Sequence, residues 1–281
     1  MTKSISALFF VTVLLAQPSP APQPHLYPGR TGLTLIALAN DGFALATDGA
    51  QFNADGTISE VQKIFPIGKT GAAVLAGQVS VQDPVTRPVR EEFNAARVTE
   101  LWLNAHHDAT FETATQELNS LILQAANRFF STRDPGRAAG TYKFALLFVE
   151  FKDGKPALYG TRYFMPAAPG QAMRATSITA TPHPGEIWVF GLVKTTQELL
   201  AGNSATLKKY KADPALVKLR ASRSQVSAQY FLSAFDVALQ AAESPDGQKF
   251  DSGRSVIAPP NRLATITNDG FSFGKKSTGT N

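Results

Sequence analysis

A carboxylate, a lysine and a glycine stand at the ends of apolar stretches in the early part of the chain. Asp48 closes the apolar run FALAT, Lys63 lies in SEVQKIFPIG, and Gly77 ends AAVLAG. Taken singly, each has an ordinary structural explanation: a strand-end turn, an exposed strand lysine and a strand-to-helix turn. Taken together, they could supply a paired ammonium and carboxylate beside a backbone that a reacting group can approach closely.

Several other chemistries are excluded by residue type or spacing. The chain has no cysteine, which removes thiolate nucleophiles and disulfides, and no G-x-S-x-G sequence. Gly68-Lys69-Thr70 resembles the end of a phosphate loop, but Lys63 stands where the first glycine should be, so we predict a hairpin turn there. The histidines show no metal-ligand spacing; they are His25, His106, His107 and His183. We expect no metal and no cofactor.

The first thirty residues are typical of an exported protein. Residues 1–16, MTKSISALFFVTVLLA, combine one lysine with a short apolar run and are predicted to be a signal peptide cut after Ala16. An uncleaved membrane anchor is the alternative, although the run is short for a bilayer. Residues 17–30 form a Pro-rich linker or propeptide, whose prolines oppose strand pairing. We therefore expect a periplasmic or secreted protein without stable membrane insertion after cleavage.

The elements that would position these residues are hairpins and amphipathic helices. Two apolar runs flank Asn40-Asp41-Gly42, and two more hairpins turn at 152–154 and 268–270. Apolar residues recur at helical spacing in 113–130 and 224–243, and an earlier helix is expected around Arg90 to Asn104. Hairpins separated by helices predict an α+β fold, a four-layer αββα sandwich of two antiparallel sheets between helical layers.

Charge argues weakly for a polyanion partner. The net charge is +5, and one basic stretch, residues 208–225, has Tyr210 as its single aromatic residue. A solvated helix face explains this pattern better than binding to nucleic acid. A basic protein that binds anionic polymers of the envelope stays as a third, weaker hypothesis.

The order of these segments resembles the proteasome subunit-like family of N-terminal-nucleophile hydrolases. The runs GLTLIALANDGFALATDGAQ and EVQKIFPIGKTGAAVLAGQ resemble the family's N-terminal segment, and FALLFVEFKDGKPALYGTRY resembles its central hairpin. The resemblance covers residues 31–274, leaving a polar tail at 275–281. It implies the four-layer fold and identifies the chain as a divergent exported member of the family.

The resemblance also implies roles for four residues. An N-terminal threonine, Thr31 here, would attack a peptide carbonyl and use its own α-amine as base, after removal of residues 1–30. Asp48 and Lys63 fall on the family's supporting acid and lysine, which would lower the pKa of the threonine hydroxyl. Gly77 falls on the glycine whose backbone N–H would bind the oxyanion.

The first position of the site is ambiguous in the sequence. Counting back from Asp48 without a gap places Gly32 on the nucleophile position, whereas one extra residue in the Asn40–Gly42 loop would place Thr31 there. Arg30 also replaces the glycine that the family usually has before the threonine. Positions that support the nucleophile in the family also differ here. The family's small residues are replaced at 192–194, and its supporting acid is hard to place near 244–246. Ser252 matches a supporting serine of the family weakly.

Two functions follow, of different classes. The first is an exported threonine-type peptidase or amidohydrolase that cleaves peptide or protein substrates. The alternative is a non-catalytic subunit of the same fold that assembles or binds partners in the cell envelope. In both cases the family resemblance implies a possible homo-oligomeric ring, and no nucleic acid partner is expected.

Overall fold

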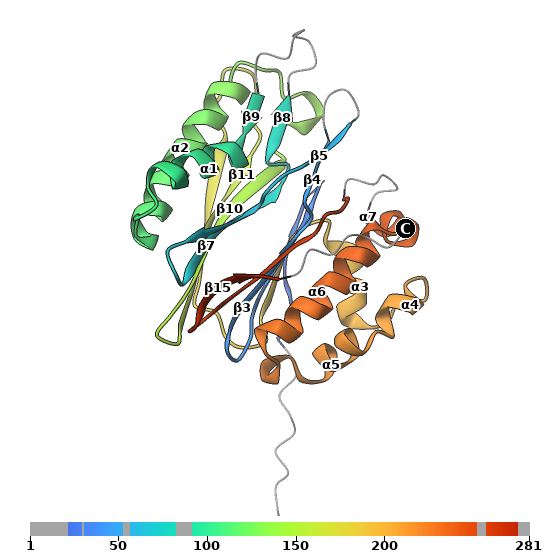
Figure 1. Ribbon diagram of the computed structural model, residues 1–281. Coiled ribbons are helices and arrows are strands. Elements are labelled where there is room, and N and C mark those ends of the chain that lie inside the picture. Colours follow the sequence, from blue (N-terminus) through green and yellow to red (C-terminus); the bar gives the residue numbers. More distant parts are fainter. Residues whose placement is uncertain (1–21, 30, 53–56, 83–91, 252–256, 275–281) are drawn as a thin grey trace, which may run out of the picture.

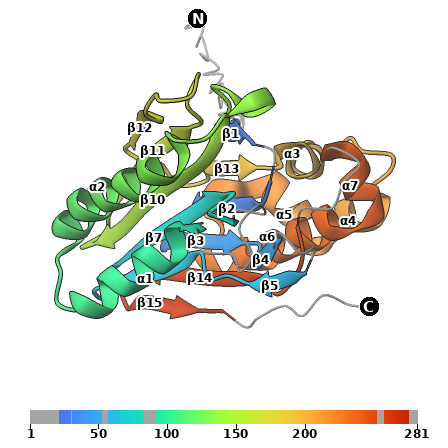
Figure 2. The same ribbon diagram turned by 90° about the horizontal axis from the view of Figure 1, so that it is seen from above.

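Two β-sheets are stacked face to face between two layers of helices in the computed structural model, as Figures 1 and 2 show. The structure describes residues 22–29, 31–52, 57–82, 92–251 and 257–274. The predicted signal peptide at 1–16 and tail at 275–281 lie outside these residues. The predicted α+β class and four-layer αββα sandwich are confirmed.

The first sheet has six strands in the order β1-β13-β2-β3-β14-β15. All neighbours in it are antiparallel except β1 and β13, which are parallel. Its strands are β1 (His25–Pro28), β2 (Leu33–Leu38), β3 (Gly42–Thr47), β13 (Ile187–Gly191), β14 (Arg262–Thr267) and β15 (Gly270–Phe273).

The second sheet has five antiparallel strands in the order β12-β11-β10-β7-β6. These are β6 (Ile64–Ile67), β7 (Gly71–Gly77), β10 (Tyr142–Lys152), β11 (Lys155–Phe164) and β12 (Arg174–Ala180). Two short pairs extend from the sheets: β4 (Ala50–Phe52) with β5 (Ile58–Glu60), and β8 (Ser80–Gln82) with β9 (Glu92–Asn94). The predicted turn at Gly68–Thr70 is confirmed, because it joins β6 to β7.

Helices cover the outer face of each sheet. α1 (Ala95–Ala105) and α2 (Phe111–Phe130) pack on the five-stranded sheet. The six-stranded sheet carries α3 (Val193–Ala201), α4 (Lys208–Lys211), α5 (Pro214–Ser222), α6 (Ala228–Glu243) and α7 (Pro245–Asp251). Short 3-10 turns lie at Gly136–Ala138 and Arg223–Gln225. The helices predicted at 113–130 and 224–243 are α2 and α6, and the earlier one is α1, beginning at Ala95.

Burial on both faces explains why the strands read as continuous apolar runs. All six residues of β2 are buried: one set faces the α6 side and the other faces the second sheet. Between the sheets, Trp188 and Phe190 of β13 join apolar residues of both sheets in one cluster. Within the described residues, no helix combines the length and apolar character needed to span a bilayer.

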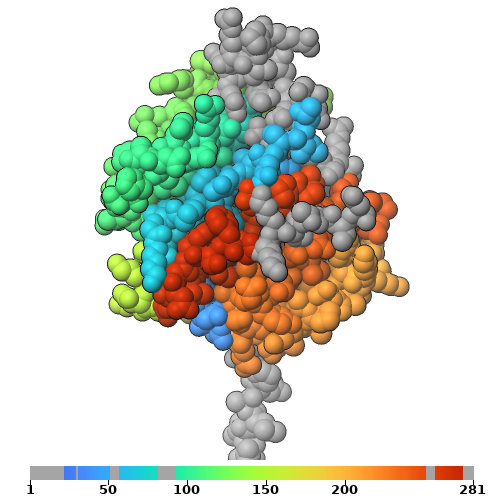
Figure 3. Space-filling model, in the orientation of Figure 1, coloured from blue at the N-terminus to red at the C-terminus, as the bar shows by residue number. Residues whose placement is uncertain are grey.

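The turns match their sequence signals. Lys152 pairs with Lys155 across the tip of the β10–β11 hairpin, and Asp153 and Gly154 adopt φ angles of 52° and 70°. Two positive φ angles are what a two-residue hairpin turn requires. On the face shown in Figure 3, the β6–β7 turn lies against the β14–β15 hairpin, where the Phe271 N–H donates to the Lys69 carbonyl oxygen at 2.8 Å. A backbone hydrogen bond therefore also joins the two sheets where the β6–β7 turn meets the β14–β15 hairpin.

Candidate functional site

A buried ion pair lies at the ends of the central strands. Asp48 directly follows β3 and Lys63 directly precedes β6, and the Lys63 Nζ donates to both carboxylate oxygens of Asp48 at 2.9 Å. The side chain of Lys63 is 2% exposed and that of Asp48 is 1% exposed. The backbone N–H of Leu33, the first residue of β2, donates to Asp48 Oδ1 at 2.8 Å. The predicted association of Asp48 with Lys63 is thus present and ties three strands together.

Gly77 lies beside this pair at the end of β7. Its φ is 86°, and a Cβ built on it would lie 2.7 Å from the Lys143 carbonyl oxygen, so the position accepts only glycine without rearrangement. Its own carbonyl oxygen lies 3.3 Å from a Cβ built on Gly32. The strand ends therefore bring Gly32, Asp48, Lys63 and Gly77 to one place.

Gly32, and not Thr31, stands next to the ion pair. A Cβ built on Gly32 would lie 3.2 Å from Asp48 Oδ1 and 3.5 Å from Lys63 Nζ. The Thr31 side chain makes no hydrogen bond to Asp48, Lys63 or Gly77. The residue that faces the lysine therefore has no hydroxyl, and its φ of 69° would strain a threonine placed there.

The register of the first hairpin gives the reason. β2 and β3 pair without interruption from Thr34 and Thr47 to Leu38 and Phe43. The Ala39 N–H then donates to the Gly42 carbonyl oxygen at 2.8 Å and closes the turn. A loop with one extra residue, which would have moved Thr31 to the site, is not formed.

The chain before Gly32 is built into the sheet. β1 pairs with β13, and the Gly29 N–H donates to the Gly191 carbonyl oxygen at 2.7 Å. Tyr27 stacks on Phe190 with ring centroids 4.5 Å apart. The expectation that prolines keep residues 17–30 out of strand pairing is therefore wrong for 25–28. β1 is an edge strand with its proline at the last position, where a missing N–H is tolerated.

Further contacts hold this N-terminal segment. The His25 ring stacks on Trp188 at 5.2 Å, and the buried Arg223 donates from Nη1 to the Pro22 carbonyl oxygen at 2.8 Å. Burial lowers the pKa of Arg223. The division of the chain at residue 31, into a linker or propeptide and a domain, stays a prediction.

Two titratable side chains near the site were not found by sequence reasoning. Burial raises the pKa of Glu243, at the end of α6, to about 7; Asn261 opposes this shift, whereas Asp48 and Asp236 add to it. Burial lowers the pKa of Lys143, whose Nζ donates to Gln78 Oε1 at 2.7 Å, to about 8. Charged residues are common at the ends of helices and the starts of strands, where Glu243 and Lys143 lie. No local pattern in the sequence therefore sets either residue apart.

The supporting positions do not assemble as the family resemblance implied. Leu192 precedes α3 and its N–H donates to the Gly32 carbonyl oxygen at 2.8 Å, with an apolar side chain in the core. Ser244 follows α6 as its C-cap, and the exposed Asp246 pairs with Lys249 at 3.1 Å. Ser252 lies outside the described residues.

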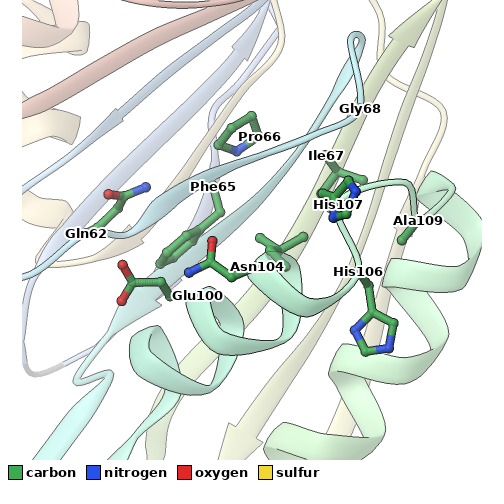
Figure 4. Close-up of a pocket in the computed structure, with 11 residues that line it drawn as sticks. Gln62, Phe65, Pro66, Ile67, Gly68, Glu100, Asn104, His106, His107 and Ala109 are labelled. Atoms are coloured by element: carbon green, nitrogen blue, oxygen red, sulfur yellow. The ribbon is translucent and has the colours of Figure 1, made fainter.

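Three cavities lined by described residues lie away from the ion pair. The one in Figure 4, about 410 Å³, lies between β6 and α1, with Phe65, Glu100 and Asn104 converging at one end and His107 beside Ile67 at the other. The other two, about 540 Å³ and 620 Å³, lie at the start of α2 and among the hairpin turns. Among the described residues, no three His, Asp or Glu side chains come together as a group that could hold a metal ion.

Comparison with known proteins supports a shared fold. No family model and no curated protein matches the chain. The helical assembly of the Anbu complex from Pseudomonas aeruginosa is similar in structure, with 14% identity, a TM-score of 0.53, and coverage of 89% of this chain and 88% of that one. Anbu from Hyphomicrobium sp. strain MC1 has 14% identity, a TM-score of 0.49 and coverage of 87% and 86%.

These findings correct the family assignment made from the sequence. Solved structures that this chain resembles include the Anbu complex, so the identification of the chain as a divergent exported member of the proteasome subunit-like family is wrong. At 14% identity the likeness extends to the fold alone. The chain has a proteasome-like N-terminal-nucleophile hydrolase fold, in which Gly32 lies next to the Asp48–Lys63 ion pair.

Proposed function

We propose that this protein is a non-catalytic subunit of proteasome-like fold, exported to the cell envelope, where it acts by assembling with other subunits or binding partners. One observation carries the proposal: the residue that faces Lys63 and Asp48 is Gly32, which has no hydroxyl. Acyl transfer by this fold's chemistry needs a side-chain nucleophile and a free α-amine as its base.

The upstream chain supports the same conclusion. Gly32 is preceded by β1, whose pairing, stacking and Arg223 contact fix residues 22–29 to the body of the protein. While that segment stays attached, the nitrogen of residue 31 or 32 is an amide, and an amide nitrogen cannot accept the proton of a hydroxyl. Removing residues 1–30 would also remove an edge strand of the sheet.

A different role then falls to the ion pair. Asp48 accepts hydrogen bonds from Lys63 and from the Leu33 backbone, so it fixes the start of β2 to the end of β3 and to the segment before β6. Both charges are buried and paired, which makes the loss of either partner costly. We therefore assign the Asp48–Lys63 ion pair the role of stabilising the fold.

One observation favours a second candidate, hydrolysis by Thr31 after cleavage between Arg30 and Thr31. Asp48 and Lys63 keep a pairing that could activate a hydroxyl, and Gly77, whose N–H the oxyanion would need, lies beside them. In that mechanism the Thr31 hydroxyl oxygen attacks a peptide carbonyl while its α-amine takes the proton. The amine product leaves, and water then hydrolyses the ester.

Peptide hydrolysis separates the two candidates. The full chain and a chain that begins at Thr31 are incubated with unstructured peptides, and products are followed by mass spectrometry, with Thr31→Ala and Lys63→Met as matched controls. The proposal expects no hydrolysis above the Thr31→Ala background in either form. Hydrolysis by the Thr31-initiated chain that both substitutions abolish would establish the peptidase instead.

A further inference from the structure

We propose that β12 is an interface strand, on which a second copy of this chain pairs antiparallel about Ser177. The inference rests on the assembly role proposed above and names its surface and its partner. It depends on how the edges of the two sheets differ, on the direction of the backbone groups of β12, and on the residues that a two-fold pairing about Ser177 would place opposite one another.

Three of the four sheet edges are protected or short. At the β6 edge, Pro66 has no N–H to offer, and the Gln62 side chain donates to the Ile64 carbonyl oxygen at 3.0 Å. β1 has four residues and ends in Pro28, and β15 also has four residues. Short strands and prolines are common means of preventing edge-to-edge association.

β12 has none of these features. It has seven residues, RATSITA, with no proline, and Arg174 at its first position is its single charge. Among the described residues, β11 is its one neighbour in the sheet. A long edge strand rich in β-branched residues and without a central charge is a template for another strand.

The register shows which backbone groups point away from β11. On β10, the Phe151 N–H donates to the Thr70 carbonyl oxygen on the β7 side. Backbone groups alternate in direction along an antiparallel strand, so those of Lys152 point to β11. Lys152 pairs with Lys155, so the backbone groups of Lys155 and of every second residue after it on β11 point to β10. The backbone groups of the residues between them, including Gly160, point to β12, where Gly160 pairs with Ile178. The outward-pointing backbone groups of β12 therefore belong to Ala175, Ser177 and Thr179.

These three positions suit a two-fold partner. Their side chains are exposed, whereas Ile178, between them, is buried against the inner cluster. With a two-fold axis at Ser177, Ala175 would face Thr179 of the second copy and Ser177 would face Ser177. Arg174 would face Ala180, so the two arginines lie at opposite ends and do not repel. Such a self-complementary strand forms a closed, isologous dimer.

A disulfide test reports the register directly, because the chain has no cysteine of its own. Directly opposed residues in a hydrogen-bonded antiparallel pair have Cα atoms about 5.5 Å apart, a distance that a disulfide spans. Under mild oxidation, Ser177→Cys is expected to give a disulfide-linked dimer on a non-reducing gel. Ala175→Cys is the matched control, since its copies lie about 13 Å apart along the strand and should not link.

Oligomeric state gives the second readout. Light scattering of the full chain should give a dimer mass or a multiple of it. Ser177→Pro, which removes one outward N–H, should halve that mass while the circular dichroism spectrum of the folded chain is retained, and Ser177→Ala should leave the mass unchanged. A monomeric wild type, equal linking of both cysteine variants, or an unchanged Ser177→Pro mass would overturn the proposal. Neither readout depends on hydrolysis, so the assignment of Gly32 to the site stands or falls separately.

Discussion

At the scale of single residues, the ion pair of Asp48 and Lys63 is the most consequential feature of the molecule. Its two side chains are buried and bonded to each other at 2.9 Å. Placing charges in the interior costs free energy that only a partner recovers. The pair therefore gives a large stability effect when one member is lost, whether or not the protein has an activity.

We predict that Lys63→Ala lowers the free energy of unfolding by about 3 to 5 kcal/mol, because Asp48 then stays buried without its partner. Lys63→Met should cost less, since it keeps the volume of the side chain. Urea unfolding measures both, and Lys69→Ala, at an exposed lysine, serves as the control, with an expected change within about 0.5 kcal/mol.

A double-mutant cycle sharpens this test. Combining Lys63→Ala with Asp48→Ala should cost less than the sum of the two single substitutions, because the second removes a charge that the first left unpaired. Strict additivity, or a Lys63→Ala variant as stable as the wild type, would mean that the two side chains are not coupled.

Glu243 predicts a pH dependence of stability. Its pKa is about 7 in the folded protein, against about 4.3 in an unfolded chain. Between these values the folded state retains a proton that the unfolded state has released, so this residue's contribution to stability falls as pH rises to about 7 and is level above that. Glu243→Gln stays neutral throughout and should flatten this part of the profile.

The measurement is urea unfolding at intervals from pH 5 to 8, with Glu112→Gln, an exposed glutamate on α2, as the matched control. The slope between pH 5 and 7 should be less negative in Glu243→Gln than in the other two proteins. An identical slope in all three would show that Glu243 is not titrating in this range.

At the scale of elements, the sequence predicts those whose signals are local. Asp-Gly pairs mark the β2–β3, β10–β11 and β14–β15 hairpins, and apolar residues at helical spacing mark α2 and α6. β1 was missed because its flanking prolines resemble those of a linker, although an edge strand pairs on one side only. β12 was missed because RATSITA has too weak an alternation to be recognised.

The same distinction applies to the site. The meeting of Asp48, Lys63 and Gly77 was implied by the family resemblance, and each of the three stands at the end of a strand that the sequence marks. The choice between Thr31 and Gly32 could not, since it depends on the register of β2 against β3, which the loop length leaves free by one residue. Glu243 and Lys143 depend on burial by segments distant in sequence, which no local pattern encodes.

β1 gives a prediction at this scale. A chain that begins at Thr31 loses the Tyr27–Phe190 and His25–Trp188 stacks together with the packing of Leu26. We expect its free energy of unfolding to fall by at least about 2 kcal/mol relative to a chain that begins at Gln17. Thermal melting by circular dichroism compares them, and a chain that begins at Pro22 should match the longer one.

Equal melting of all three chains would mean that β1 contributes nothing and that residues 17–30 are a removable linker. A further check on the mechanism is Tyr27→Ala in the full chain. It should reproduce part of the loss, because it removes one stack and leaves the backbone pairing intact.

At the scale of the whole molecule, the four layers enclose the ion pair of Asp48 and Lys63, beside which Gly32 lies, and β1 precedes Gly32 in the chain. The chain resembles in fold the Anbu complex from Pseudomonas aeruginosa, which is described as a helical assembly. A protein of this fold without a hydroxyl at Gly32 still has two sheets, two helical layers and a β12 edge on which no other described strand pairs. This is why we assign it an assembly role.

The central claim is that the segment before Gly32 stays attached in the working protein. The intact mass of the protein recovered from the cell envelope of its own organism tests this most directly. We predict a mass that corresponds to a first residue at or before Pro22, with Gln17 expected if cleavage follows Ala16. A mass corresponding to Thr31 or Gly32 as the first residue would contradict the account, because β1 would then have been removed and an α-amine exposed at the site.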